Sequence, residues 1–210
     1  MNFHKKNTLL TALGLMCVLF SGLASAHAGH EVSVSFMSGL MHPLTGIDHL
    51  LVIVLVGFWS AFVLKSVWLG PYAFLTGMCL GVLAGIVGFP LGLFEFGIAA
   101  SVIAIGLLLL VNKQYSPRAI LILLGAFGIF HGFAHTQQFS NSSFGASFVT
   151  QDIAGLVLAT AILHFSGAVL VKFLKDKTSV IAKIAGFASV IYGSVLFGQL
   201  SFALLGGASV

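Results

Sequence analysis

The stretch HPLTGIDHLLVIVLVGFWSAFVL, residues 42–64, joins two histidines, an aspartate, a proline and a glycine to a long apolar run. An apolar run of about 20 residues is the length with which an α-helix crosses a hydrocarbon core about 30 Å thick. The whole chain of 210 residues is similar, with 59% hydrophobic residues, 7% charged residues and a mean hydropathy of +1.12. This composition predicts an all-α, polytopic membrane protein in a lipid bilayer, with no nucleic-acid partner.

The N-terminal run has the pattern of a secretory signal peptide. Two lysines precede a short apolar stretch, residues 8–20, and Ala24-Ser25-Ala26 follows it. We therefore expect residues 1–26 to be removed and residues 27–210 to form one membrane domain, although an uncleaved first helix is the alternative. Cleavage leaves Cys79 as the only thiol, which excludes an internal disulfide and a thiolate cage for zinc or an iron–sulfur cluster.

Six apolar segments follow the signal, and they predict six transmembrane helices. They cover residues 36–64, 71–89, 93–111, 119–138, 148–171 and 184–204. With the new N-terminus outside, all basic residues of the mature chain lie in or beside loops on one side: Lys65, Lys113, Arg118, Lys172, Lys175, Lys177 and Lys183. This positive-inside pattern predicts that both mature termini lie outside, in the periplasm or the extracellular space. We expect the membrane to be a bacterial inner (plasma) membrane.

Glycines recur at helical spacing in two of the segments. Gly77, Gly81 and Gly85 are four residues apart, as are Gly128 and Gly132. Small residues at this spacing let two membrane helices approach closely. We interpret them as packing positions, not as functional ones.

Ionisable residues gather at one depth when this topology is applied. Burying such a group in hydrocarbon costs roughly 2.5–3.5 kcal/mol, and such groups usually face a cavity, a partner or a transport pathway. A functional site is therefore the first hypothesis. The residues of the outer layer are His42, Asp48, His49, Glu95, His131, His135 and Asp152, whereas His164 lies deeper.

The spacing of four of these residues favours a metal site. His131 and His135 are four residues apart, so a regular helix points both imidazoles at one neighbour, and two such nitrogens can share a divalent ion. Asp48 and His49 are adjacent, so one can ligate while the other orients it or faces another helix.

His42 is harder to place. On a regular helix it lies about 10.5 Å from His49 along the axis, too far for easy sharing of one ion. Either Pro43 and Gly46 break the helix and draw the two histidines together, or His42 is a separate outer station. Pro43 is also suited to be the first residue of a helix. For His164 the simpler interpretation is a hydrogen bond between helices.

At these residues the sequence resembles a known family. HPLTGIDH is similar to the H-P-x-x-G-x-D-H signature of the HupE/UreJ nickel permeases, and the resemblance continues through HGFAH and ATAILHFSG. It implies a secondary transporter that carries Ni²⁺, or Co²⁺, inward for hydrogenase or urease, with handover to maturation proteins of nickel enzymes. It implies roles in metal binding for His42, Asp48, His49, Glu95, His131 and His135.

The chain departs from that family at one position. The family usually reads H-G-x-A-H-G-x-E, and this chain has Gln138 where the carboxylate is expected. An amide still offers an oxygen, but the site loses one negative charge. We expect affinity, metal choice or proton coupling to differ from the family pattern.

The same residues also fit functions other than transport. A membrane metalloenzyme or metal sensor would use similar histidines but keep its ion, and an enzyme would need a substrate pocket and a general acid or base. A haem protein with paired histidines is a further alternative. The residues themselves suit nickel, cobalt, zinc and Cu(II), so nickel is implied by the resemblance alone. No G-x-x-x-x-G-K-[ST] motif occurs, which argues against ATP hydrolysis.

Overall fold

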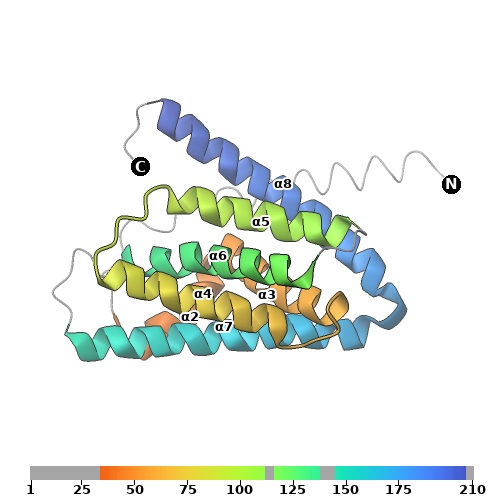
Figure 1. Cartoon of the computed structure of the whole chain (residues 1–210), viewed down its shortest axis with the longest axis horizontal. Helices are drawn as coiled ribbons and strands as arrows, with labels where there is room; N and C mark the ends of the chain where they lie inside the picture. The colour runs from red at the N-terminus through yellow and green to blue at the C-terminus, as the bar shows by residue number, and fades with distance from the viewer. Residues whose placement is uncertain (1–33, 112–115, 138–144, 207–210) are drawn as a thin grey trace. The chain divides into compact units, whose positions relative to one another are not determined.

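A computed structural model describes residues 34–111, 116–137 and 145–206. Within these ranges the regular secondary structure consists of helices joined by short connections, with no strand, as Figure 1 shows. The elements are α2 (Phe36–Thr45), α3 (Ile47–Phe62), α4 (Leu69–Ile86), α5 (Phe94–Leu110), α6 (Pro117–Thr136), α7 (Ala146–Leu174), the short 3-10 helix η3 (Lys175–Lys177) and α8 (Thr178–Leu205). The expected signal peptide, Lys113 and Gln138 lie outside the described residues.

The six predicted segments correspond to six helical segments, with α2 and α3 together forming the first. The largest boundary error is at α8, which begins at Thr178 and not near residue 184. The sequence predicts Lys183 in or beside the loop before this helix. In the structure Lys183 lies within the second turn of α8, so the helix begins before the apolar segment at residues 184–204.

Length and hydropathy alone identify fewer spans than the fold contains. Among the described residues, α4, α6 and the continuous run Ala146–Leu205 are long and apolar enough to cross a membrane, and α2 with α3 make a fourth if the bent pair is one span. The run Ala146–Leu205 contains both α7 and α8, each of which is long enough by itself. Helix α5 has 17 residues, the lower limit for a spanning helix.

The helices pack in pairs whose directions agree with alternate crossing. Helix α4 packs mainly on α6, α5 on α8, and both α2 and α3 on α7. Contacts follow the chain in the same direction along α4 and α6 and along α2–α3 and α7, but in opposite directions along α5 and α8. The contacting pairs are Gly77 with Gly125, Gly85 with Thr136, Gly39 with Asp152, Gly57 with His164, Gly106 with Gly186, and Gly193 with Ile103.

The predicted glycine packing is confirmed between α4 and α6. A Cβ atom at Gly77 would collide with the carbonyl of Gly125, and one at Gly81 would collide with that of Ile129. On the facing helix, Gly132 is equally close to the carbonyl of Met78. Because the two backbones touch, the side chains next to these glycines are held at fixed separations.

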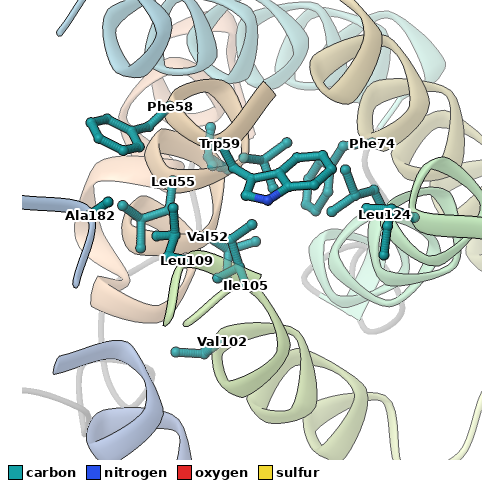
Figure 2. Packing of buried hydrophobic residues seen from close by; sticks show 13 residues of the cluster. Val52, Leu55, Phe58, Trp59, Phe74, Val102, Ile105, Leu109, Leu124 and Ala182 are labelled. Atoms are coloured by element: carbon teal, nitrogen blue, oxygen red, sulfur yellow. The ribbon is translucent and has the colours of Figure 1, made fainter. Parts of the chain in front are cut away.

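The apolar core lies beside this contact. Figure 2 shows Val52, Trp59 and other side chains of α3 meeting Phe74 of α4 and Ile105 of α5. Val52, Trp59, Phe74 and Ile105 are at most 3% exposed. Phe74 also contacts two histidine rings, so the core borders directly on the ionisable residues.

Candidate metal site

A sharp break in the first segment brings His42 and His49 together. Helices α2 and α3 meet at Gly46 at an angle of 86°. The ring centroids of His42 and His49 are 6.3 Å apart, far closer than a straight helix would allow. Of the two alternatives left by the sequence, the structure therefore shows the broken helix.

Pro43 does not start a helix, and that interpretation is wrong. It lies buried in the last turn of α2, which begins at Phe36 behind a capping box of Ser35 and Ser38. Proline removes a backbone donor from a helix interior, so it weakens the end of α2 immediately before Gly46. The next helix, α3, then starts in a new direction.

Helix α6 completes a group of four imidazoles. His131 and His135 are 1% and 2% exposed, and both face the break between α2 and α3. The ring centroids of His42 and His135 are 4.4 Å apart, those of His49 and His131 are 4.6 Å apart, and those of His49 and His135 are 5.2 Å apart. We call His42, His49, His131 and His135 the four-histidine cluster.

Asp48 orients the central ring of the cluster. Its Oδ1 atom lies 3.2 Å from Nδ1 of His49. A carboxylate accepts hydrogen bonds, so a neutral His49 carries its proton on Nδ1 and a lone pair on Nε2. That Nε2 atom is buried and has no hydrogen-bond partner.

Ser101 of α5 orients a second ring in the same way. Its hydroxyl donates to the carbonyl of Ile98 at 2.6 Å, and its Oγ atom lies 2.9 Å from Nε2 of His131. Because the hydroxyl proton is already used, Nε2 of a neutral His131 donates to Oγ, which leaves the lone pair on Nδ1. Nδ1 is also buried without a partner. Ser101 is not among the site residues predicted from the sequence, because an isolated serine in an apolar helix gives no sign of a functional role.

The remaining ionisable residues of the outer layer lie outside these ring contacts. Glu95 is half-buried in the first turn of α5 and forms no hydrogen bond or ion pair with another described residue. Asp152 of α7 is 1% exposed and accepts a hydrogen bond of 2.6 Å from the hydroxyl of Ser38 in α2. It therefore joins α7 to the helix that carries His42.

In this conformation the cluster is not a formed metal site. Among the described residues, no three His, Cys, Asp or Glu side chains converge closely enough to hold an ion. The arrangement supplies two buried, unpartnered lone pairs on His49 and His131, whose rings are in contact. Small rotations of these rings are needed before both lone pairs point at one ion.

Comparisons with known proteins identify the family of the chain. Residues 15–196 match the family described as HupE / UreJ protein. The chain is 34% identical over 198 residues to Protein HupE of Rhizobium leguminosarum bv. viciae, and this similarity covers 93% of the chain and 98% of that protein. No solved structure matches significantly. The helical membrane fold, the HPLTGIDH stretch at the break and the extent of these matches establish that the chain belongs to the HupE/UreJ family.

Proposed function

We propose that this protein is a secondary transporter that imports a divalent transition metal ion, Ni²⁺ or alternatively Co²⁺, across the bacterial inner membrane. The ion is the transported substrate and not a resident cofactor. It binds first at the four-histidine cluster with Asp48, and Glu95 of α5 is a further metal-binding residue of the proposal. The observation that carries this proposal is the pair of buried, unpartnered nitrogens, Nε2 of His49 and Nδ1 of His131.

The separations between the rings support binding of one ion. Imidazole nitrogens bind divalent metals at about 2.1 Å, so two imidazoles on one ion have centroids roughly 4.5–5.5 Å apart. Three of the ring pairs in the cluster are 4.4–5.2 Å apart. The backbones thus hold the rings at nearly the right distance, and ligation requires mainly reorientation.

The donor set favours borderline metals. Imidazole nitrogen and carboxylate oxygen suit Ni²⁺ and Co²⁺, whereas Cu(I) prefers thiolate and thioether ligands. The cysteine of the described helices, Cys79, is exposed and belongs to none of the ring contacts. Family membership adds nickel to this argument, and an ion imported this way would be passed to maturation proteins of nickel enzymes.

Uptake into sealed vesicles tests transport against retention of the ion. Purified protein in liposomes with an internal nickel-sensitive dye should accumulate many Ni²⁺ ions per protein, at a rate above that of protein-free liposomes. A metalloenzyme or sensor that keeps its ion would bind about one ion and then stop. Accumulation that never exceeds one ion per protein would therefore exclude the transporter.

Asp48→Asn is expected to weaken Ni²⁺ binding about 10- to 100-fold, the usual effect of losing a partner that orients a ligating histidine. The amide is similar in shape but does not attract the Nδ1 proton of His49 as a carboxylate does. Isothermal calorimetry on the detergent-purified variant measures this. Thr76→Ala is a matched control, because Thr76 is exposed and its hydroxyl only donates to the carbonyl of Tyr72 in the same helix. Equal affinity in Asp48→Asn and the wild type would remove Asp48 from the site.

Gln138→Glu is expected to tighten binding of Ni²⁺ or Co²⁺. Position 138 follows the last described residue of the α6 segment, two positions after Thr136, and a carboxylate there adds a negative charge and a stronger oxygen donor. Uptake need not become faster, since an ion held more tightly leaves more slowly. The affinity is measured by calorimetry, and uptake into vesicles is measured alongside. Gln151→Glu, at an exposed position of α7, serves as a control for added charge. Unchanged affinity in Gln138→Glu would show that this position does not act on the ion.

A further inference from the structure

His164 is a second buried histidine without a hydrogen-bond partner. It lies in α7, is 1% exposed, and neither Nδ1 nor Nε2 finds a partner. The expected hydrogen bond between helices is therefore wrong for His164. A buried polar group without a partner is destabilising, so packing alone is a poor reason for an imidazole at this position.

A single aromatic ring links His164 to the four-histidine cluster. Phe74 of α4 is fully buried, and its ring centroid is 5.2 Å from that of His131 and 5.4 Å from that of His164. The free Nδ1 of His131 and the two free nitrogens of His164 thus belong to rings that contact the same phenylalanine. In ion pathways, hydrophobic constrictions gate by excluding water.

Other metal-binding atoms lie at the same contact of α4 and α7. Thr160 and Met78 are both buried, and the Thr160 Oγ1 atom lies 3.8 Å from the Met78 Sδ atom. Thr160 is one helical turn before His164, and Met78 is one turn after Phe74, so each pair shares a helix face. A hydroxyl, a thioether and an imidazole therefore follow one another, and a transition metal accepts all three.

His164 also borders a surface pocket. The pocket has a volume of about 280 Å³, and its lining includes Trp68, Tyr72 and Phe165. It lies where α4 begins, at the end of the bundle that carries Lys65. His164 is thus next to the core on one side and next to this pocket on the other.

We infer that His164 is a second, transient station for the transported ion, which reaches it from the four-histidine cluster when Phe74 moves aside. From His164 the ion continues toward the end of the bundle that carries Lys65. This inference rests on the proposed transport function and adds the inward half of the path. The two stations have different roles. The four-histidine cluster determines the affinity of the protein for the ion, and His164 determines the rate at which the ion passes through.

The test separates binding from passage. His164→Phe keeps a ring of similar size and removes both nitrogens. We expect Ni²⁺ affinity at the cluster to stay within twofold of the wild type by calorimetry, and uptake into liposomes to fall at least tenfold. His164→Cys restores a ligating atom and is expected to recover uptake relative to His164→Leu. Ile162→Phe, an exposed position on the same helix, is the matched control and should transport normally.

Each outcome decides the inference. Uptake by His164→Phe within twofold of the wild type would overturn it while leaving transport intact. If the wild type itself accumulates no Ni²⁺, the proposed function fails, and that result is visible before any variant is examined. If His164→Phe does not fold, as judged by loss of a monodisperse elution peak, His164→Leu is measured in its place. Uptake by His164→Leu within twofold of the wild type would then overturn the inference. Equal uptake by His164→Cys and His164→Leu would also count against a ligating role.

Discussion

His49→Ala is expected to lower the Ni²⁺ affinity of the purified protein at least about a hundredfold, more than loss of an orienting partner would. His49 contacts three other histidine rings, and its Nε2 atom is one of the two buried lone pairs that carry the proposal. Its removal also leaves Asp48 without the ring that it orients. Calorimetry at neutral pH, where imidazoles are largely free to ligate, measures the loss.

The control for His49→Ala is Phe58→Ala, which removes another buried ring from α3 outside the cluster. It is expected to keep its Ni²⁺ affinity, so a general effect of losing a buried ring from α3 is excluded. An affinity of His49→Ala within tenfold of the wild type would contradict a metal site centred on this residue. Loss of binding in both variants to the same degree would instead indicate damage to the fold.

Gly132→Ala is expected to lower the melting temperature by roughly 2–12 °C, the effect of an overpacking penalty of about 1–3 kcal/mol in a domain of this size. A Cβ atom at Gly132 would collide with the backbone carbonyl of Met78, and backbone cannot rotate away as a side chain does. Helix α6 would then move from α4 and carry His131 with it. We expect Ni²⁺ affinity to fall about tenfold as well.

Gly198→Ala is the matched control for Gly132→Ala. Gly198 is also inside a helix, α8, but a Cβ atom there meets nothing within 4 Å. Alanine is a better helix former than glycine by about 1 kcal/mol, so thermal stability should be unchanged or slightly higher. Thermal unfolding of the detergent-purified variants, followed by circular dichroism, compares them. Equal stability of Gly132→Ala and the wild type would mean that α4 and α6 do not depend on this close contact.

Much of the fold and part of the candidate site could be predicted from local patterns. The six helical segments follow from runs of apolar residues, and the α4–α6 contact follows from glycines four residues apart. The shared direction of His131 and His135 follows from helical periodicity. The interpretations of Pro43 as the first residue of a helix and of His164 as a hydrogen bond between helices were wrong, because each depends on neighbours distant in the chain. A proline can stand in the first turn of a helix or in a last turn that it weakens, and the residues beside it in the chain do not decide between the two. Whether a buried histidine has a hydrogen-bond partner depends on side chains of other helices.

The sequence by itself determined that the chain forms membrane helices, because hydrophobicity over about 20 residues and helical periodicity are local properties. It also determined which residues with ionisable or ligating atoms occur along those helices. Only the tertiary structure decided the 86° bend at Gly46, the contact of Ser101 with His131, and the place of Phe74 between two histidines. A bend angle and the neighbours of a side chain depend on packing between helices that are far apart in the chain. The candidate histidines can therefore be named from the sequence, but their tautomers and their neighbours in the bundle depend on which helices touch.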